Sequence, residues 1–241
     1  MGSFFKASAL CLVALCGMQS GADAKALTFV VKPVGDDAYT TLNLARNGDL
    51  TVNINSLERK STLEETLKTA LNTSATALTG SECSSMQFHS TLDKTTLHTG
   101  YSKAAGPDYR QMIQKVLDDG LKVGDLASYP SSWTNVWSDA NGANLANLLW
   151  SKSNGVGCAL AVCAEDAAET DTAFLVCQMD PAPQLNNAPF EKPYYLALKE
   201  RTTKLKDMKE EELKGTTGGS SIAVPSVLLA SLVALIATTA A

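Results

Sequence analysis

Residues 156–163 (VGCALAVC) and residues 172–179 (TAFLVCQM) are the two stretches that decide the fold of this chain. Small and apolar residues fill both, and their period of two favours extended strands over helices. The residues between them, 164–171, are polar and acidic. Pro181 and Pro183 follow the second stretch and end it. The sequence therefore predicts a β-hairpin with a long loop at residues 164–171.

Helical patterns dominate the chain before the hairpin, apart from a short strand at residues 26–31 and a brief extended stretch at residues 50–54. The clearest helix covers residues 62–78, with Ser61 and Glu64 as a capping box at its start. Its apolar stripe consists of Leu63, Leu67, Leu71, Ala75 and Leu78. The other predicted helices cover residues 36–46, residues 107–120, and shorter segments around Trp133, Trp137 and residues 144–150.

Residues 1–24 have the three parts of a secretory signal peptide. Lys6 supplies the positive charge, and residues 7–17 form an apolar stretch too short to span a bilayer. Residues 22–24 (ADA) match the small-residue pattern that signal peptidase cleaves. We therefore expect cleavage before Lys25 and an extracellular protein; a short buried helix is the alternative.

The other end of the chain carries a second processing signal. Residues 215–221 are small and polar, and residues 222–241 are apolar and uncharged to the last residue. A conventional transmembrane helix is usually followed by basic residues, whereas this pattern is typical of a glycosylphosphatidylinositol (GPI) signal. The predicted attachment region includes Gly215, Gly218, Gly219 and Ser220, and the tail to be removed is residues 219–241. A retained single-span helix is the alternative, and either form tethers the domain outside the cell.

Four cysteines follow residue 24, and in an oxidising compartment they imply two disulfides with three possible pairings. If Cys158 faces Cys177 across the hairpin, then Cys163 faces Thr172. Cys158 and Cys163 point to opposite faces of the sheet, because their positions differ by an odd number. We therefore expect Cys158–Cys177 to staple the hairpin, and Cys83–Cys163 to join its other face to a helix. A zinc site is not expected, because none of the spacings is C-x-x-C.

The composition of the 241-residue chain excludes several classes of protein. Hydrophobic residues make up 45% of it, and roughly 195 residues between the two signals are enough for one packed domain. With 20 basic and 25 acidic residues the net charge is −5, which argues against nucleic acid as a partner and against a polybasic membrane surface. The charged run at residues 199–214 is expected to form a solvated stalk or spacer.

Five short motifs occur in a fixed order along the chain. They are L-N-x-x-R at residues 42–46, G-x-x-C…H-S at residues 80–90, W-x-x-S at residues 150–153, G-C-A-x-x-x-C at residues 157–163 and C-x-x-D-P at residues 177–181. In this order and spacing they resemble the CAP superfamily, which includes cysteine-rich secretory proteins, antigen 5 and plant pathogenesis-related class-one proteins. The resemblance covers residues 39–195.

The whole chain also resembles the GPI-anchored surface antigens of Eimeria-type coccidian parasites, through C-x-x-D-P-A-P at residues 177–183 and A-P-F-x-K-P-Y at residues 188–194. The resemblance implies an α+β fold, an α-β-α sandwich with a small antiparallel sheet between helical layers. The expected domains are a signal peptide (1–24), a CAP-like extracellular domain (25–195), a charged stalk with the GPI attachment region (196–218) and a removed tail (219–241).

The same resemblance implies a non-enzymatic coat antigen on the outer leaflet of the plasma membrane, held there by its glycolipid. The expected partners are host-cell surface components or host antibodies, with a role in host-cell attachment or host immune interaction. Extracellular lipid or sterol carriage, which some CAP proteins perform, is the first alternative and needs an apolar pocket. An enzyme such as a protease or metal-dependent hydrolase is the second.

Many CAP proteins hold a divalent metal with two histidines and two acidic residues, and the resemblance carries this set over only in part. His89 matches the first histidine, but Asn144 stands where the second is expected. Residues 99–105 contain no carboxylate where the family has an acid, and Asp139 is the candidate for the second acid. His98, the other histidine, is expected in an exposed loop. We therefore predict no metal site and no cofactor, with His89 as a vestige.

No motif indicates catalysis, since the chain lacks G-x-S-x-G, H-E-x-x-H and a phosphate-binding loop. A free-cysteine nucleophile is not expected either, because all four mature cysteines have disulfide partners available. Asn72-Thr73-Ser74 is the one N-glycosylation sequon of the chain, and it lies on the polar side of a predicted helix. We predict a glycan on Asn72.

Overall fold

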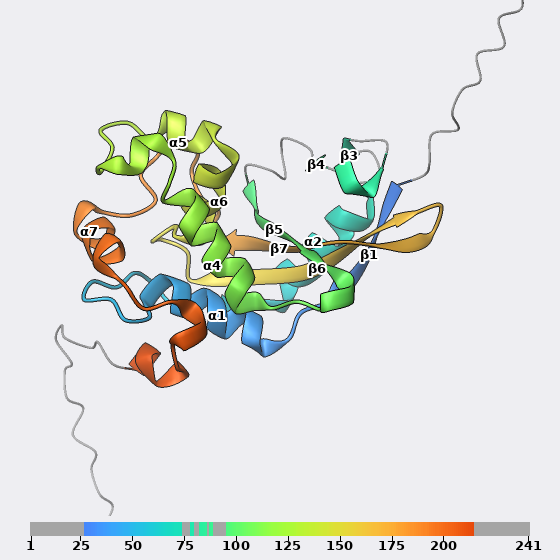
Figure 1. Ribbon diagram of the computed structural model, residues 1–241, viewed down its shortest axis with the longest axis horizontal. Helices are drawn as coiled ribbons and strands as arrows, with labels where there is room; N and C mark the ends of the chain where they lie inside the picture. Colours follow the sequence, from blue (N-terminus) through green and yellow to red (C-terminus); the bar gives the residue numbers. More distant parts are fainter. Residues whose placement is uncertain (1–26, 74–77, 80–81, 86, 89–94, 215–241) are drawn as a thin grey trace, which may run out of the picture.

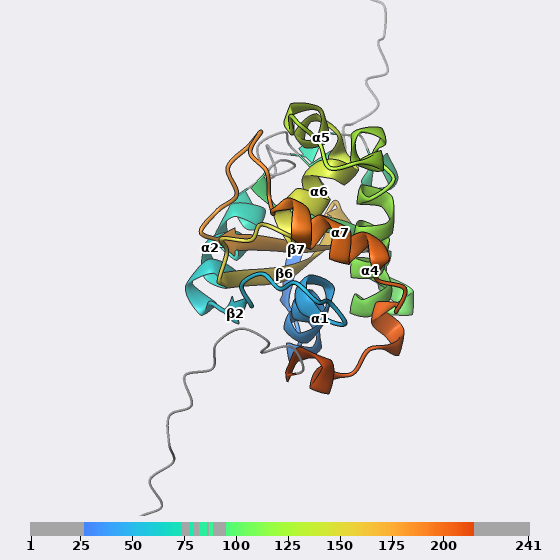
Figure 2. The ribbon, with the colours of Figure 1, turned by 90° about the vertical axis from the view of Figure 1, so that its left-hand side faces the viewer.

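The computed structural model describes residues 27–73, 78–79, 82–85, 87–88 and 95–214. Helices lie on both faces of a central sheet, so that the domain has three layers (Figure 1 and Figure 2). The strand order is β1-β6-β7-β5, all antiparallel, and the two-residue β2 pairs in parallel with β6. This is the α-β-α sandwich that the resemblance to the CAP superfamily implied. In the described part of the chain, no helix is both long and apolar enough to cross a bilayer.

Most elements lie where the sequence pattern placed them. The long strands are β1 (Leu27–Pro33), β5 (Leu97–Ser102), β6 (Gly155–Glu165) and β7 (Ala168–Asp180). The helices are α1 (Asp36–Asn47), α2 (Ser61–Thr73), α4 (Tyr109–Gly120), α5 (Thr134–Ser138), α6 (Ala140–Leu148) and α7 (Lys192–Glu200). Shorter elements are β2 (Glu58–Arg59), β3 (Leu78–Thr79), β4 (Gln87–Phe88), and the 3₁₀ turns η2 (Cys83–Ser85), η5 (Leu205–Asp207) and η6 (Glu210–Lys214).

The β6–β7 hairpin has the predicted register, but the predicted long loop is wrong. Cys158 faces Cys177, as expected. Beyond Val162 the register shifts, because β7 has two more residues than β6 before the next pair, Ala164 and Glu169; Cys163 therefore does not pair with Thr172 as expected. Pairing continues to a two-residue turn at Asp166 and Ala167, where φ is 50° and 69°. Positive φ at both central residues gives a turn whose twist matches that of the flanking strands. Most of residues 164–171 therefore belong to the two strands of the hairpin and do not form a separate loop.

Helix α2 is shorter than the helix predicted over residues 62–78, because it ends at Thr73. Leu78, the last residue of the predicted stripe, instead pairs with Phe88 in the small β3–β4 sheet. Leu67 and Leu71 of the stripe are each 1% exposed and pack under the sheet as expected.

Residues 50–54, which the sequence predicts to be briefly extended, do not pair as a strand. Asn47 Oδ1 accepts the Ile54 N–H at 2.9 Å, and Asn43 exchanges hydrogen bonds of 2.7 and 2.9 Å with the backbone of Leu57. These two amides from the last turns of α1 satisfy backbone groups that a neighbouring strand would otherwise pair. The segment is therefore held as a loop over the end of the helix.

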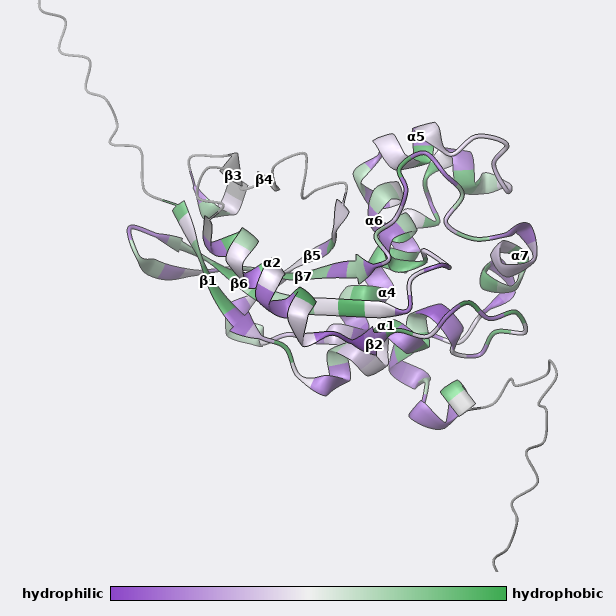
Figure 3. Ribbon diagram, turned by 180° about the vertical axis from the view of Figure 1, so that it is seen from behind, coloured by the Kyte–Doolittle hydropathy of each residue, from purple (hydrophilic) through white to green (hydrophobic). Residues whose placement is uncertain are grey.

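Each face of the sheet has its own hydrophobic core. On one face α2 packs against β1, β6 and β7 around a smaller core that includes Phe29, Leu67 and Cys163. On the other face α1, α4, α6 and α7 cover a larger core that includes Cys158 and Cys177. In Figure 3 the hydrophobic colour lies mainly on the sheet and on the helices packed against it. The two cysteines of β6 therefore belong to opposite cores, as their odd separation predicted.

The two disulfides fix the hairpin within the domain. Cys158 and Cys177 are directly opposed, with their Cα atoms 4.1 Å apart. Cys83 and Cys163 join the smaller core to η2, with their Cα atoms 5.8 Å apart. These are the two pairs predicted from the hairpin register.

Arg46 of α1 is a fully buried cation that organises the loops around the larger core. Its guanidinium donates to the carbonyls of Asn55, Leu148, Trp150 and Ser153 at 2.7–3.2 Å. Burial lowers the pKa of Arg46 to about 10, which leaves it protonated at neutral pH. Several neutral carbonyls thus replace the water and the counter-ion that a buried charge needs.

The charged run at residues 199–214 is packed on the domain, so its assignment to a stalk is wrong. Beyond α7 we call Arg201–Lys214 the C-terminal segment. Leu205 is fully buried and Met208 is 4% exposed, where the segment lies against α1 and α4. Arg201 Nη1 donates to three carbonyls at the end of α1, at 3.0–3.3 Å. The folded domain therefore extends to Lys214, beyond the boundary expected at residue 195.

Candidate functional site

Of the residues considered for a metal set in the sequence, Asn144 and His98 line a cleft between β5, α4 and α6, which we call the β5–α6 cleft. It encloses about 190 Å³. Its lining comes from His98, Thr99 and Gly100 of β5, Lys115, Val116 and Asp119 of α4, Asn141 and Asn144 of α6, and Phe174 of β7. Residues of four elements therefore build one polar hollow at the edge of the sheet.

His98 and Asn144 meet in this cleft, although the sequence placed His98 in an exposed loop. His98 is half-buried in β5, between the buried residues Leu97 and Thr99 and opposite Val176. Asn144 is 8% exposed, and its Oδ1 accepts the backbone N–H of His98 at 2.9 Å. The amide that stands in place of a histidine thus ties α6 to the edge strand of the sheet.

The other predicted members of a metal set do not join the cleft. Asp139 caps α6, and its Oδ1 accepts the backbone N–H groups of Asn141 and Gly142 at 2.8 and 3.0 Å. Among the residues that the structure describes, no group of three or more histidine, cysteine, aspartate or glutamate side chains is placed to hold a metal. His89 lies outside the described residues, so the loss of the CAP metal set stays a prediction.

The ion pair at the rim of the cleft was not predicted from the sequence. The Asp119 carboxylate accepts hydrogen bonds from the ammonium groups of Lys115 and Lys122, the latter at 3.4 Å. The hydrogen bond from Lys115 is the main cause that holds the pKa of Asp119 below its ordinary value. The i,i+4 spacing of Lys115 and Asp119 on a helix was the signal that could have identified it.

The chemistry available in the β5–α6 cleft is that of a polar binding site. Its described residues offer one imidazole, two amides, a hydroxyl, a Lys–Asp pair and one aromatic ring. Both pairs of cysteines in the described chain are disulfide-bonded, so these residues supply no thiol nucleophile. Hydrogen-bond donors and acceptors of this kind recognise polar groups, and nothing in their geometry activates a nucleophile.

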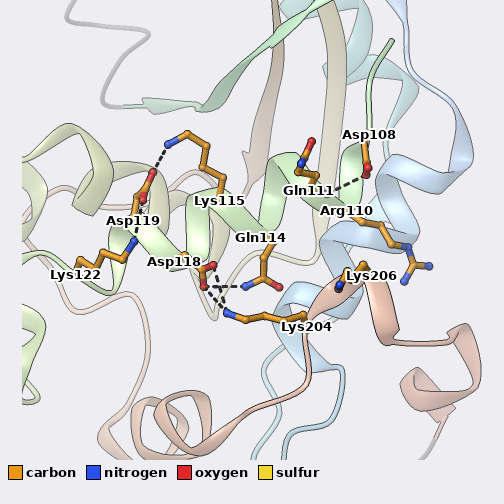
Figure 4. Close-up of a pocket in the computed structure, with 10 residues that line it drawn as sticks. All are labelled: Asp108, Arg110, Gln111, Gln114, Lys115, Asp118, Asp119, Lys122, Lys204 and Lys206. Atoms are coloured by element: carbon orange, nitrogen blue, oxygen red, sulfur yellow. Dashed lines mark hydrogen bonds and ion pairs between the residues drawn. The ribbon is translucent and has the colours of Figure 1, made fainter. Parts of the chain in front are cut away.

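A larger cavity of about 400 Å³ lies between α4 and the C-terminal segment, and we call it the α4 groove (Figure 4). Its lining consists of Asp108, Arg110, Gln111, Gln114, Lys115, Asp118, Asp119, Lys122, Lys204 and Lys206. Asp118 accepts hydrogen bonds from Lys204 at 3.1 Å and from Gln114 at 2.9 Å. The sequence gave no sign of this cavity, because the lysines of one wall were assigned to the stalk.

A third polar cluster connects α1, α2 and the hairpin. Glu64, expected to cap α2 with Ser61, instead accepts hydrogen bonds from the Tyr39 hydroxyl and from Arg59 Nε, the latter at 2.6 Å. The Tyr39 oxygen in turn accepts the Cys158 backbone N–H at 3.3 Å. Burial is the main cause that raises the pKa of Tyr39, while the Arg59 hydrogen bond lowers that of Glu64. The cluster is a structural brace, with both groups in their ordinary charge states at neutral pH.

The predicted modification sites are only partly within the described chain. Asn72 is exposed near the end of α2, as a glycosylated asparagine must be. The predicted attachment residues Gly215, Gly218, Gly219 and Ser220 lie outside the described residues, as does the signal peptide. Their roles therefore stay predictions.

The fold, two disulfides and the polar cleft define a disulfide-stabilised α-β-α sandwich of the kind suited to an oxidising environment. The sequence matches the profile of CAP, the cysteine-rich secretory protein family, over residues 40–179, which is more than half of the chain. The protein therefore belongs to the CAP family. No curated protein matches the sequence significantly.

Several solved structures are similar to this chain at low sequence identity and with TM-scores below 0.5. The Eimeria tenella surface antigen protein SAG19 is 18% identical with a TM-score of 0.46, over 71% of this chain and 97% of that one. The hookworm platelet inhibitor is 17% identical with a TM-score of 0.42, over 67% and 79% of the two chains. The structure of NaASP2 with Zn²⁺ is 15% identical with a TM-score of 0.38, over 65% and 82%. The family assignment rests on the sequence profile.

Proposed function

We propose that this protein is a non-enzymatic surface antigen, held on the outer leaflet of the plasma membrane by a GPI anchor and engaged in host-cell attachment or host immune interaction. The observation that carries the proposal is that the CAP domain is folded up to Lys214, and the predicted attachment region begins at the next residue. An anchor joined there would present a complete domain close to the membrane surface.

The segment that carries the resemblance to the coccidian surface antigens, residues 188–194, supports the proposal through its part in the core. The Phe190 and Tyr194 rings pack with their centroids 5.2 Å apart, and Tyr129 donates to the Phe190 carbonyl at 2.9 Å. The Tyr194 hydroxyl donates to the Arg46 carbonyl at 2.7 Å. The motif therefore specifies how α7 closes the larger core, which is a reason for related sequences to share it.

The anchor is tested by treating intact cells that express the full chain with phosphatidylinositol-specific phospholipase C. We expect the protein to be released into the medium. The matched control replaces residues 215–241 with a transmembrane helix followed by basic residues, and this form should stay on the cells. If the native chain also stays while a known GPI protein is released, the anchor is a retained helix.

The role in attachment is tested with the phospholipase-released protein. We expect saturable binding to host-cell membranes that excess unlabelled protein displaces. Binding no greater than that of an unrelated released GPI protein would exclude attachment and leave the antigen role, which antibodies raised against the folded domain would then test.

Glycosylation of Asn72 is a separate part of the proposal. Asn72→Gln and Ser74→Ala both remove the sequon, and each should lower the apparent mass of the secreted chain by one glycan. Thr73→Ala keeps the sequon and serves as the matched control. Equal mobility of all these forms would show that the site is not used.

Sterol carriage, the alternative function, requires an apolar cavity. All residues that line the α4 groove, and most of those that line the β5–α6 cleft, have charged or polar groups that an apolar sterol would have to remove from water. A sterol titration of the released protein should therefore show no saturable binding, and saturable binding would favour the alternative.

A further inference from the structure

The α4 groove is basic, although the chain as a whole carries a net charge of −5. Its lining contains five cationic side chains and three carboxylates, an excess of two positive charges. The cations are Arg110, Lys115, Lys122, Lys204 and Lys206. A concave surface with one sign of excess charge concentrates ions of the opposite sign. The groove is therefore a place where an acidic protein attracts anions.

Each carboxylate of the groove is already engaged within the domain. Asp108 accepts a backbone N–H at the start of α4, at 3.0 Å. Asp118 holds the Lys204 ammonium at 3.1 Å, and Asp119 lies between two lysines, with Lys122 at 3.4 Å. These contacts hold lysine ammonium groups along the walls, as Figure 4 shows. The carboxylates thus orient cations and do not by themselves close the groove to an anion.

The wall formed by the C-terminal segment is fixed by buried contacts. Leu205 is fully buried, and its N–H donates to Gln114 Oε1 at 2.9 Å. Arg110 Nη1 donates to the carbonyls of Leu205 and Met208, both at 2.7 Å. Lys206, the residue after Leu205, lines the groove and makes no ion pair within the described part of the chain. Its ammonium is therefore available to a ligand on a wall that is already ordered.

We propose that the α4 groove binds a phosphate or sulfate ester carried on a saccharide, and that the C-terminal segment is the wall without which the site is incomplete. The volume of about 400 Å³ is in the range of small-molecule sites and larger than one oxyanion needs. Lysine ammonium groups bind phosphate and sulfate oxygens through charge-assisted hydrogen bonds. Gln111 adds an exposed amide that can bind a sugar hydroxyl. The proposal does not depend on the anchor, nor on His98 and Asn144 of the cleft.

The test uses the full chain, purified in detergent, and calorimetric titration with sucrose octasulfate and with inositol hexakisphosphate. Sucrose and inositol are the matched uncharged probes. We expect at least one anionic probe to bind, with an affinity that falls as ionic strength rises, and neither neutral probe to bind. A preference for one anionic probe would identify the ester as sulfate or phosphate. Absence of binding by both anionic probes would overturn the proposal.

The location is tested with two variants that change the net charge equally. Lys204→Ala with Lys206→Ala should weaken binding about ten-fold or more, since two charge-assisted contacts are lost. Lys199→Ala with Lys209→Ala removes two exposed lysines outside the groove and should change binding by less than about two-fold. An equal loss in both variants would show a net-charge effect and overturn the site. Lys206→Ala alone keeps the Lys204–Asp118 pair, and it should still weaken binding if the double variant fails to fold.

Discussion

Strand β6 buries ten of its eleven residues, whereas the C-terminal segment buries Leu205 and Met208 and is otherwise held by polar contacts to α1 and α4. A continuous buried strand is stabilised mainly by the apolar surface that it removes from water. A short charged segment has little such surface, so its few hydrogen bonds to carbonyls and its two apolar side chains decide whether it docks. Substitutions in the two regions should therefore follow different rules.

The largest effect is expected from the disulfide that joins the hairpin to the rest of the smaller core. Replacing Cys83 and Cys163 with alanine should lower the free energy of unfolding by up to about 4.5 kcal/mol, because 80 residues separate them. Replacing Cys158 and Cys177, which are 19 apart, should lower it by about 3 kcal/mol. Urea unfolding of the two double variants measures both. A larger loss for the pair within the hairpin would contradict the loop-length argument.

Leu205→Ala tests whether the C-terminal segment belongs to the folded domain. The side chain is fully buried, so its truncation should lower the free energy of unfolding by about 2–4 kcal/mol. Leu196→Ala is the matched control, because that leucine is 48% exposed and its loss should matter by less than about 0.5 kcal/mol. If the two variants unfold at the same urea concentration, the segment is the solvated stalk that its composition suggests.

The contrast between the two regions explains which parts of the fold could be predicted. Successive residues of a strand point to opposite faces, so the positions of Cys158, Cys163 and Cys177 predict the register and the faces of the hairpin. The C-terminal segment offers Leu205 and Met208 in a run of charges, without a helical or strand period. The irregularity opposite Cys163 was equally invisible, because two extra residues in β7 leave the alternation of its faces unchanged.

The candidate sites also divide into features that a local sequence pattern predicts and features that depend on how distant segments pack. The sequence predicts a departure from the CAP metal set, since Asn144 stands where the resemblance places a histidine, and that departure stays a prediction. The contact of Asn144 with the His98 backbone could not be predicted, because that depends on how α6 meets the edge strand. The α4 groove requires Lys204 to meet Asp118, which precedes it by 86 residues. Residues so distant form a site only through the docking that the local pattern failed to predict.

Glu64→Gln tests the polar brace behind the hairpin, and its effect should depend on pH. The Arg59 hydrogen bond lowers the pKa of Glu64 in the folded protein, so its stabilising effect is complete above the unfolded pKa of about 4.3. That contribution is lost as the pH falls through the lower, folded pKa. The variant should lose about 1 kcal/mol at neutral pH and approach the native chain in acid.

Urea unfolding at a series of pH values measures this difference. Glu65→Gln on the same helix is the matched control, since that side chain is 75% exposed and its pair with Lys68 is 3.8 Å long. A difference between Glu64→Gln and the native chain that stays constant into acid would show that the loss comes from packing and not from the ionised carboxylate.

The smallest effect is expected at the tip of the hairpin, where glycine at two neighbouring positions should change the stability in opposite directions. Ala167 has a φ of 69°, and this left-handed backbone conformation is strained in any residue with a Cβ atom. Ala167→Gly should therefore raise the free energy of unfolding by about 0.5–1 kcal/mol. Ala168→Gly, one residue later at the start of β7, should lower it by about 0.5 kcal/mol, because glycine in a strand loses more conformational freedom on folding. Thermal unfolding of the two variants should therefore shift in opposite directions. If both shift downwards, the turn is not held in the left-handed conformation. Both shifts should be smaller than that of Leu205→Ala, because the hairpin is stabilised by its buried strands and not by the turn that joins them.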